Sequence, residues 1–440
     1  MAALPLCNII KFIAVHFFAF ILHCVIIFYN IFRLVYFNSI KLAANWSPKA
    51  RLWLDGRKDW QNEFQKKWQL KPFEKAVWMH CASLGEFEQG RPLLEQLKKE
   101  NTHIKILVTF FSPSGYEIRK NYEGADFVMY LPADSNKNAK TFLNLANPAL
   151  AIFVKYEFWH FYLAELKQRK IETILVSGIF RNTQPFFQWW GSFYKNMLLN
   201  FSHLFVQDQA SAALLSSINI TSNVTVCGDT RFDRVVTNAQ QWKPIPAIET
   251  FIQPDKKILV AGSTWKEDEE LIAQWWMQNN NEWQLIIAPH EIDEQHIEHL
   301  QKLFADAVRF STYKNQPAMV MIVDTIGHLS KIYRYATVSC IGGGLTKNGV
   351  HNTAEAAVYG KPVLFGPVYE KYKEAVDLIH LKAAFSFANK EEFAAIIQHL
   401  SNENVYASSA TAAKKYVLEN SGAAQIIINY IQEKRLFTSA

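Results

Sequence analysis

Short apolar segments alternate with amphipathic segments along most of the chain, and this alternation restricts the possible folds more than any other feature of the sequence. Most of the apolar segments end in glycine, serine, proline or aspartate. Such a pattern is typical of parallel α/β sheets, whose strands are joined by helices. Ligands of these sheets collect outside the carboxyl ends of the strands, so the residues that follow each strand are the first candidates for chemistry.

The pattern occurs in two halves, which predicts two domains. In the first half the predicted strands are 76–80, 104–109, 127–131, 150–154, 173–177, 204–207 and 224–227. In the second half they are 256–263, 283–290, 318–325, 336–344 and 361–367. A chain of 440 residues is too long for one ordinary core and suits two domains with a cleft between them.

The amino-terminal segment is long and apolar enough to associate with a membrane. Residues 12–29 carry no Asp, Glu, Lys or Arg, and their number lies near the lower limit for a transmembrane helix. His16, His23 and Asn30 recur every seven residues, which favours a helix that lies in the membrane interface or packs against the protein. No signal-peptide cleavage pattern follows, and Lys and Arg accumulate after the segment, so the bulk of the chain should face the cytoplasm. A buried helix of a soluble protein is the alternative.

These features predict four parts of the chain. Residues 1–45 form a membrane anchor, and 46–240 form an N-terminal Rossmann-like domain. Residues 241–256 contain three prolines and no clear periodicity, which indicates an interdomain linker. Residues 257–440 form a C-terminal Rossmann-like domain.

Charge and cysteine usage exclude several classes of function. Lys and Arg number 46 against 40 Asp and Glu, a mild excess without the dense basic clusters of a nucleic-acid-binding protein. A phosphorylated lipid or an acidic membrane face suits this charge. The five cysteines form no C-x-x-C pair, and neither a P-loop, a D-x-D sequence nor a His/Cys cluster occurs, so we predict no metal and no cofactor.

The first candidate catalytic residue is Glu86, in a loop of small residues that follows the strand 76–80. Gly85 allows a sharp turn there, and a helix is predicted to begin near Pro92. A carboxylate in this position can remove a proton from an attacking hydroxyl, as a base in an inverting sugar transfer. The alternative is a structural role, in which Glu86 interacts favourably with the helix dipole.

Two further charged residues follow strands of the first half. Glu157 has aromatic neighbours that suggest partial burial, where an unpaired charge is costly; structural pairing with Lys155 or Arg181 is equally consistent with the sequence. Arg231 offers a fixed cation, and a local ion pair with Asp233 is its structural alternative.

The second half contains two segments suited to a nucleotide. Ser263 and Thr264 precede four acidic residues, as in a strand, a phosphate-sized turn and a helix with an acidic first turn. Three consecutive glycines, 342–344, end another strand and precede a helix that contains Glu355. Amide groups there can hold a phosphate, and Glu355 can accept hydrogen bonds from ribose hydroxyls, although a structural glycine loop is the alternative.

Nine segments, taken together and in order, resemble the Kdo (3-deoxy-D-manno-octulosonic acid) transferases of lipopolysaccharide synthesis, glycosyltransferase family 30. They are LWLDGRKDW, HCASLGEFEQGRPLL, ILVTFFSPSGYE, LPAD, YEFW, GDTRFD, AGSTWKEDEE, DTIGHLSKIYRYA and IGGGLTKNGVHNTAEAAVYGKPVLFGP. They extend from the end of the anchor to Pro367.

The resemblance implies a GT-B fold, with two Rossmann-like domains that face a central cleft and a membrane-anchor helix. The N-terminal domain would bind the acceptor, a lipid A precursor such as lipid IVA, and the C-terminal domain would bind CMP-Kdo. The reaction would need no metal. The enzyme would lie at the bacterial inner membrane, with both domains on its cytoplasmic side.

The resemblance also implies roles for individual residues. Glu86 corresponds to the catalytic base, and Glu157 and Arg231 correspond to a pair that stabilises the transition state. The implied CMP contacts are Pro289, His290, Ile326, Gly327, His328, Asn352 and Glu355. We add Ser263 and Thr264 as contacts on the phosphate side.

Two positions depart from the family pattern. The family usually has Lys in place of Arg231, whose forked guanidinium has a different geometry, and Arg in place of His290, which can be neutral near pH 7. The nearest rival function is another GT-B transferase or a non-hydrolysing epimerase that uses a UDP-sugar. A catalytically silent membrane scaffold is a rival from a different class, against which the presence of Glu86, Glu157 and Arg231 weighs.

Overall fold

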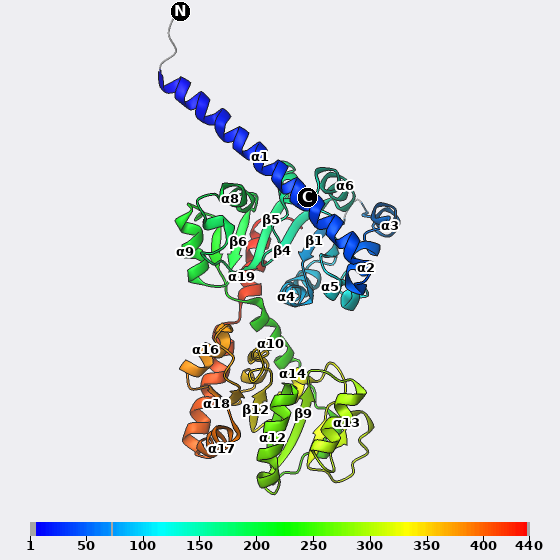
Figure 1. Ribbon diagram of the computed structural model, residues 1–440, viewed down its shortest axis with the longest axis vertical. Coiled ribbons are helices and arrows are strands. Elements are labelled where there is room, and N and C mark those ends of the chain that lie inside the picture. Colours follow the sequence, from blue (N-terminus) through cyan, green and yellow to red (C-terminus); the bar gives the residue numbers. More distant parts are fainter. Residues whose placement is uncertain (1–5, 72–73, 438–440) are drawn as a thin grey trace, which may run out of the picture. The chain divides into compact units, whose positions relative to one another are not determined.

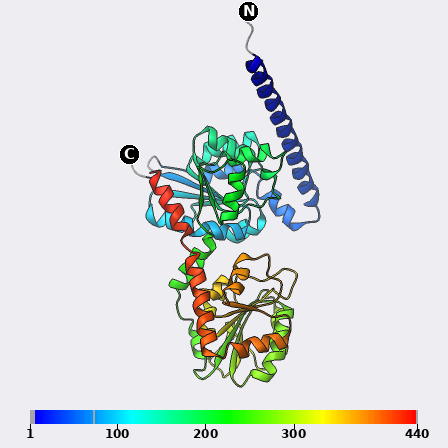
Figure 2. The same ribbon diagram turned by 90° about the vertical axis from the view of Figure 1, so that its left-hand side faces the viewer.

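The computed structural model describes residues 6–71 and 74–437, with side chains described from residue 25 onward. The chain forms two compact units (Figures 1 and 2). Unit 1 comprises Met1–Thr230 together with Gly422–Ala440, and unit 2 comprises Arg231–Ser421. Each unit contains one parallel sheet covered by helices on both faces, so the predicted α/β class is confirmed.

The sheet of unit 1 has seven strands in the order β3-β2-β1-β4-β5-β6-β7. The strands are β1 Lys75–Cys81, β2 Ile104–Phe110, β3 Phe127–Tyr130, β4 Pro148–Val154, β5 Glu172–Gly178, β6 His203–Val206 and β7 Val224–Val226. Each coincides with one of the strands predicted for the first half. β1 shows why these runs form buried strands, because Trp78 packs into the core on one face of the sheet while Val77 and Met79 pack into the core on the other.

Helices cover both faces of this sheet. Their bounds are α1 Leu6–Ala43, α2 Pro48–Asp55, α3 Trp60–Lys67, α4 Leu84–Glu100, α5 Pro113–Arg119, α6 Asn136–Ala146, α7 His160–Gln168, η1 Pro185–Phe187, α8 Ser192–Leu198, α9 Gln209–Ser217 and α19 Ala423–Glu433. α4 and α19 pack on one face, and α3, α6, α7, α8 and α9 pack on the other.

The sheet of unit 2 has seven strands in the order β10-β11-β9-β8-β12-β13-β14. The strands are β8 Lys257–Thr264, β9 Trp283–Pro289, β10 Val308–Arg309, β11 Val320–Ile322, β12 Val338–Ile341, β13 Val363–Phe365 and β14 Ala384–Ser386. Its helices are α10 Thr230–Gln240, α11 Pro246–Phe251, α12 Lys266–Asn279, α13 Glu294–Leu303, η2 Phe310–Thr312, α14 Leu329–Ile332, η3 Tyr333–Tyr335, α15 Ala354–Ala357, α16 Lys373–His380, α17 Lys390–His399 and α18 Glu403–Glu419. The five strands predicted for the second half are present, and β10 and β14 add one short strand at each edge.

The compact units differ from the predicted division at two places. The segment 241–256, predicted as a linker, contains α11 and buries Ile245, Ile248 and Phe251 in the core of unit 2. Their three-residue spacing places them on one helical face, which the prolines conceal in the sequence. The last helix, α19, lies within the predicted C-terminal domain 257–440 but packs on the sheet of unit 1 through Ile427, Ile428 and Ile431.

The first helix combines attachment to unit 1 with an apolar exposed surface. Val25, Ile26 and Tyr29 pack against the core of unit 1, and the Tyr29 hydroxyl donates to the Asp134 carboxylate at 2.6 Å. Phe28 and Phe32 are exposed. Within the described residues, Val25–Ala43 is long and apolar enough to cross a membrane. The side chains of His16 and His23, predicted to form a polar line with Asn30, lie outside the described residues.

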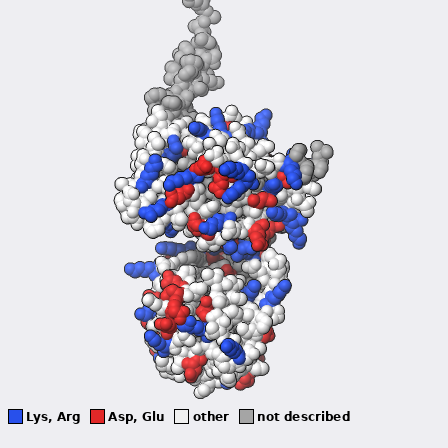
Figure 3. All heavy atoms as spheres, turned by 90° about the vertical axis from the view of Figure 1, so that its right-hand side faces the viewer, with Lys and Arg blue, Asp and Glu red and all other residues white. Residues whose placement is uncertain are grey.

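Side chains of both signs are interspersed over the face of unit 1 that Figure 3 shows. This distribution agrees with the absence of dense basic clusters in the sequence.

Candidate active site

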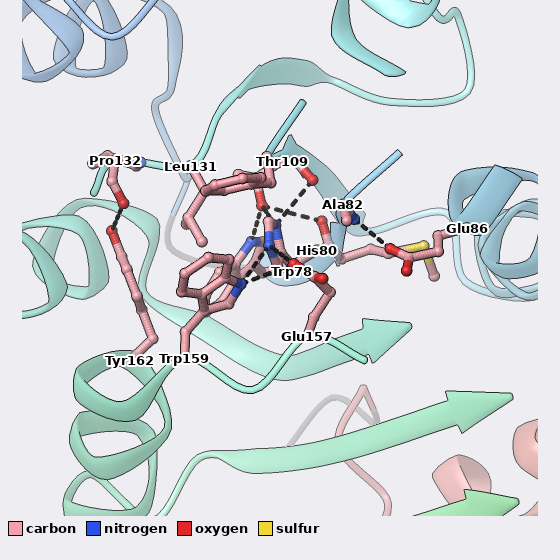
Figure 4. Close-up of polar contacts among 12 residues, drawn as sticks. Trp78, His80, Ala82, Glu86, Thr109, Leu131, Pro132, Glu157, Trp159 and Tyr162 are labelled. Carbon is pink, nitrogen blue, oxygen red and sulfur yellow. Dashed lines mark hydrogen bonds and ion pairs between the residues drawn. The ribbon is translucent and has the colours of Figure 1, made fainter. Parts of the chain in front are cut away.

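The loop that follows β1 leads directly into α4, and it positions Glu86 in the first turn of that helix. α4 begins at Leu84, so the prediction that it begins near Pro92 is wrong. Proline is common at the first position of a helix, which misled the sequence analysis, whereas here Pro92 lies inside the helix. The early start brings the Glu86 carboxylate back over the strand end, where it accepts a hydrogen bond from the backbone N–H of Ala82 (Figure 4).

The environment of Glu86 changes its proton affinity. Burial, and then the negative charge of the nearby Glu157, raise the pKa of Glu86 to about 8, although hydrogen bonds from backbone N–H groups oppose the shift. A carboxylate with this pKa holds a proton more firmly than an ordinary glutamate and matches a base that works near neutral pH. The helix position also satisfies the structural alternative, since the side chain bonds an N–H group beside the helix amino terminus.

Glu157 follows β4 and is 6% exposed. Its Oε2 atom lies 2.8 Å from Nε2 of His80 and accepts a hydrogen bond of 2.8 Å from Nε1 of Trp159. On the other side of the imidazole, Nδ1 of His80 lies 2.8 Å from the hydroxyl of Thr109. That hydroxyl also accepts a hydrogen bond from the indole of Trp78.

These contacts form one buried polar network across three neighbouring strands, β2, β1 and β4 (Figure 4). A buried polar network with every partner satisfied fixes its members in one arrangement. The network therefore holds Glu157 by His80 and Trp159, two residues that the sequence analysis did not select. The one available signal was the position of His80 at the end of a strand, beside the small-residue loop.

Arg231 lies at the start of unit 2, in the first turn of α10. Its Nη1 atom lies 3.2 Å from a carboxylate oxygen of Glu374, and its side chain is 40% exposed. The preceding residues belong to unit 1, where the Thr230 hydroxyl donates to the backbone carbonyl of Gln89 at 2.6 Å. Glu86 and Glu157 thus share unit 1, while Arg231 belongs to unit 2.

Ser263 and Thr264 are the last two residues of β8, and Trp265 alone separates them from α12. Ser263 has a left-handed backbone, with φ of 53°, and a Cβ atom on Gly342 would lie 2.3 Å from its carbonyl oxygen. Glycine at 342 therefore permits the close approach of the loop after β12. The Thr264 hydroxyl is buried and donates to the Glu269 carboxylate at 2.9 Å, so this group already has a partner inside the unit.

Asp268, in the predicted acidic first turn of α12, connects Trp265, which follows β8, to the glycine loop 342–344. Its Oδ2 atom accepts hydrogen bonds of 2.9 Å from the backbone N–H groups of Trp265 and Gly343. Burial raises the pKa of Asp268 to about 6, although the two N–H donors oppose the shift. The acidic turn is visible in the sequence, whereas this link depends on the fold.

His290 follows β9 and lies in an aromatic stack at the ends of the strands. Its ring stacks on Trp265, with centroids 4.6 Å apart, and on His351, with centroids 4.5 Å apart. The Trp265 indole also donates to Nε2 of His351 at 3.0 Å. Burial, and then the neighbouring His290, lower the pKa of His351, which favours its neutral form.

Asn352 and Glu355 lie together at the start of α15. The amide of Asn352 donates to the Glu355 carboxylate at 3.1 Å. Burial raises the pKa of Glu355, while the positive charge of Arg234 and the Asn352 amide lower it. The Glu355 carboxylate thus lies at the carboxyl edge of the sheet. Arg234 is its charged neighbour, which was not among the residues selected from the sequence.

The loop after β11 contains Ile326, Gly327 and His328. Ile326 is 88% exposed, and Gly327 has a φ of 96°, which favours glycine. Pro289, the last residue of β9, pairs in register with Thr264 of β8. These residues therefore lie on adjacent strand ends or on the loops that follow them.

Several buried polar atoms at this edge of unit 2 have no hydrogen-bond partner among the described residues. They are Thr325 Oγ1, His328 Nδ1, Thr353 Oγ1 and Asp268 Oδ1. Buried polar groups in folded proteins normally have partners, so this edge is suited to a polar ligand or to ordered water.

One group of side chains has the composition of a cation site. Oxygen or nitrogen atoms of Glu291, Asp293 and His296 lie within 4.8 Å of one another. Both acids are exposed, and Nε2 of His296 lies 2.8 Å from the buried carboxylate of Glu269. This interaction provides a structural reason for the position of His296, and we assign no ion to the group.

Comparison with known proteins gives consistent results. The sequence model of the 3-deoxy-D-manno-octulosonic-acid transferase (kdotransferase) family matches residues 58–234. A bifunctional glycosyltransferase/methyltransferase of Fusobacterium nucleatum is 27% identical over 350 residues, which cover 75% of this chain and 53% of that protein. The chain thus spans about half the length of this relative.

Two other relatives are covered over most of their length. A 3-deoxy-D-manno-octulosonic acid transferase of Aquifex aeolicus is 27% identical, over 73% of this chain and 85% of the relative. The enzyme of the same name from Haemophilus influenzae is 23% identical, over 82% of this chain and 87% of the relative.

Solved structures establish the fold class. A UDP-GlcNAc 2-epimerase of Neisseria meningitidis is similar with a TM-score of 0.57 and 16% identity, covering 81% of this chain and all of the epimerase. MurG of Acinetobacter baumannii gives a TM-score of 0.53 with 15% identity, over 82% of this chain and 99% of MurG. At these identities the likeness concerns the fold alone, which is the predicted GT-B arrangement of two Rossmann-like domains.

Proposed function

The chain belongs to the Kdo transferase family and is a glycosyltransferase, and on this premise we propose that it transfers Kdo from CMP-Kdo to a lipid A precursor, lipid IVA, in lipopolysaccharide synthesis. The observation that supports the proposal most directly is the Glu86 carboxylate, held at the end of β1 with a pKa of about 8. A transferase that attacks with a hydroxyl group needs a base of this kind.

The proposed reaction is a single displacement with inversion. Glu86 takes the proton of an acceptor hydroxyl, and the oxygen forms a bond to the anomeric carbon of Kdo. The bond from that carbon to the phosphate oxygen breaks on the opposite face, and CMP leaves. His80 and Trp159 both contact Oε2 of Glu157, and the proposal gives this carboxylate no covalent role.

The donor would occupy the carboxyl edge of unit 2. The unpartnered polar atoms of the loops after β11 and β12 suit the hydroxyl and phosphate oxygens of a nucleotide. In this proposal Asn352 and Glu355 bind the ribose, and the stacked ring of His290 contributes beside them. Arg231 supplies positive charge to the leaving phosphate, and Ser263, Thr264, Pro289, Ile326, Gly327 and His328 line the remaining contacts.

The acceptor side of the proposal rests on α1. An apolar helix with exposed Phe28 and Phe32, joined to unit 1 through Tyr29, is suited to an enzyme whose acceptor is a membrane lipid. We propose that α1 attaches the enzyme to the cytoplasmic face of the inner membrane.

The decisive experiment is a transfer assay with purified full-length protein, CMP-Kdo and a tetra-acylated lipid A precursor, with the lipid product weighed by mass spectrometry. An increase by the mass of one or more Kdo residues supports the proposal, and the number of steps counts the sugars. Binding of CMP compared with UDP separates this function from the rival use of a UDP-sugar. Preference for UDP, together with no change in lipid mass, would contradict the proposal.

A further inference from the structure

A cavity of about 430 Å³ lies between α1 and the body of unit 1. Its lining is mainly aromatic and comes from separate parts of the chain. Six of the lining residues are Phe28 and Phe32 of α1, Trp53 of α2, Phe111 after β2, Trp159 before α7 and Phe193 of α8. A concave site with such a lining is suited to an apolar ligand.

The cavity is continuous with the surface that α1 presents to its surroundings. Phe28 and Phe32 are 69% and 68% exposed, yet both also line the cavity. Large apolar side chains exposed together on one helix mark a surface that meets lipid or a partner. Phe28 and Phe32 therefore contribute both to the exposed surface of α1 and to the wall of the cavity.

Two hydrogen-bond donors in the lining have no partner. Nε of Arg33 and Nε1 of Trp53 are buried, and neither has a hydrogen-bond acceptor among the described residues. A buried N–H group without an acceptor carries a substantial desolvation penalty, so the positions of both side chains are costly to the folded state.

The cavity also adjoins the buried network of the candidate active site. Trp159 lines the cavity, and its indole N–H donates to the Glu157 carboxylate at 2.8 Å. The ring of Trp159 stacks on Phe111, another lining residue, with centroids 4.9 Å apart. A ligand in the cavity therefore contacts a side chain that holds one of the two candidate catalytic carboxylates.

From these observations we infer that the cavity binds one acyl chain of the acceptor lipid. This inference rests on the proposed function, because it takes the acceptor to be an acylated lipid. Each methylene placed in apolar contact raises the affinity about fourfold, so the chain contributes to acceptor binding as well as to its position.

A direct test locates an acyl chain without requiring sugar transfer. Full-length protein in detergent micelles is irradiated with a fatty acid that carries a diazirine group at the end of its chain, and the labelled peptides are identified by mass spectrometry. We expect label on the peptides that contain Phe111 and Phe193, competed by unlabelled lipid A precursor. Label confined to the exposed surface of α1, or not competed by the precursor, would overturn the inference.

The matched variants are Phe28→Asp and Ile31→Asp. Both residues are exposed and apolar on α1, but Phe28 lines the cavity and Ile31 does not. A change in membrane affinity would affect both variants, whereas a loss of the cavity would affect Phe28→Asp alone. We expect Phe28→Asp to reduce labelling of the Phe111 and Phe193 peptides at least fivefold, while Ile31→Asp retains it.

A transfer assay then distinguishes the chain of the acceptor from a lipid of the surrounding bilayer. Phe28→Asp should raise KM about tenfold for the tetra-acylated precursor and leave KM within twofold for its fully deacylated disaccharide. An equal effect on both acceptors, or on neither, would show that the cavity holds another lipid and would overturn the inference. If no acceptor is glycosylated by the native protein, the proposed function fails, whereas competed labelling still establishes an acyl-chain site.

Discussion

The two units place different chemistry at the carboxyl ends of similar sheets. In unit 1 the ends of β1, β2 and β4 hold a buried network in which the ring nitrogens of His80, the Thr109 hydroxyl and the Glu157 carboxylate all have partners. In unit 2 the corresponding edge carries glycines and buried polar atoms that have no partner within the described part of the chain, among them Thr325 Oγ1 and Thr353 Oγ1. The comparison indicates that the polar groups of unit 1 are held by one another, while the polar edge of unit 2 is suited to a ligand or to ordered water.

The largest expected effect concerns Glu86 of unit 1. Glu86→Gln should lower kcat by roughly 10³-fold, because general base catalysis contributes about 10²–10⁴ to the rate. CMP binding, measured by calorimetry, should remain unchanged, since the variant leaves unit 2 intact. Glu95→Gln, on the exposed side of the same helix, serves as the control and should retain full activity. Substantial turnover by Glu86→Gln would remove this residue from the base role.

The next prediction tests whether the network of unit 1 is rigid. His80→Ala removes a partner of the buried Glu157 carboxylate, and breaking a buried pair costs about 3 kcal/mol, or a fall in Tm of roughly 6–12 °C. Trp159→Phe, which removes only one neutral donor, should lower Tm by a few degrees. Thermal unfolding followed by intrinsic fluorescence checks both. If His80→Ala had the same Tm as the native protein, the preorganised network would not exist.

A smaller effect is expected where a ligand completes the edge of unit 2. Glu355→Gln should weaken CMP binding about tenfold, because a hydrogen bond from a hydroxyl to a charged acceptor is worth roughly 1.5 kcal/mol or more. Tm without ligand should change little. Glu370→Gln, in an exposed loop of the same unit, provides the control in calorimetry. Equal CMP affinity in both variants would contradict the proposed ribose contact.

The smallest effect concerns the coupling of two carboxylates within unit 1. Since the pKa of Glu86 is raised to about 8, the unprotonated base is scarce below that pH, and kcat/KM should rise about tenfold per pH unit until pH 8. Glu157→Gln keeps a hydrogen-bond acceptor but removes the charge. The pKa of Glu86 should therefore fall, and the rise of kcat/KM should occur at lower pH. A pH profile of both proteins measures the shift. If kcat/KM rose over the same pH range in both proteins, Glu157 would not influence the pKa of Glu86.

The same pKa sets the sign of a stability effect. The folded state binds the Glu86 proton between the ordinary pKa of 4.5 and about 8, while the unfolded state has released it. The contribution of Glu86 to stability therefore falls as pH rises through this window. Tm of Glu86→Gln relative to the native protein should accordingly be higher at pH 9 than at pH 5. The opposite trend would indicate that the pKa is lowered.

Much of the fold follows from the sequence because its apolar runs are long and end in small residues. All seven strands of unit 1 and five strands of unit 2 were predictable in this way. The two strands that were not predicted, β10 and β14, span two and three residues and lie at the edges of the sheet. The start of α4 was not predictable, because Pro92 resembles a helix start when the packing of the preceding turn is unknown.

The candidate site was predictable only in part. Glu86, Glu157 and Glu355 lie at the ends of strands or the starts of helices, where a charged residue next to an apolar run can be recognised in the sequence. The contacts within each site are not visible in the sequence, because His80 meets Glu157 across 77 residues of chain and Trp265 meets His351 across 86. Such pairings arise from the order of strands in a sheet, which local patterns leave undetermined. The assignment of donor contacts to Pro289, His290 and Ile326 stays a prediction.

The return of the chain to unit 1 at α19 makes unit 1 a discontinuous domain, with unit 2 inserted between its two segments. A fragment that stops at residue 230 would uncover the part of the sheet face on which Ile427, Ile428 and Ile431 pack beside α4. Such a fragment would be prone to aggregate, whereas 231–421 is contiguous and has its own core. Dissection of the enzyme should therefore separate the inserted unit, and should rejoin the two segments of unit 1 by a short linker.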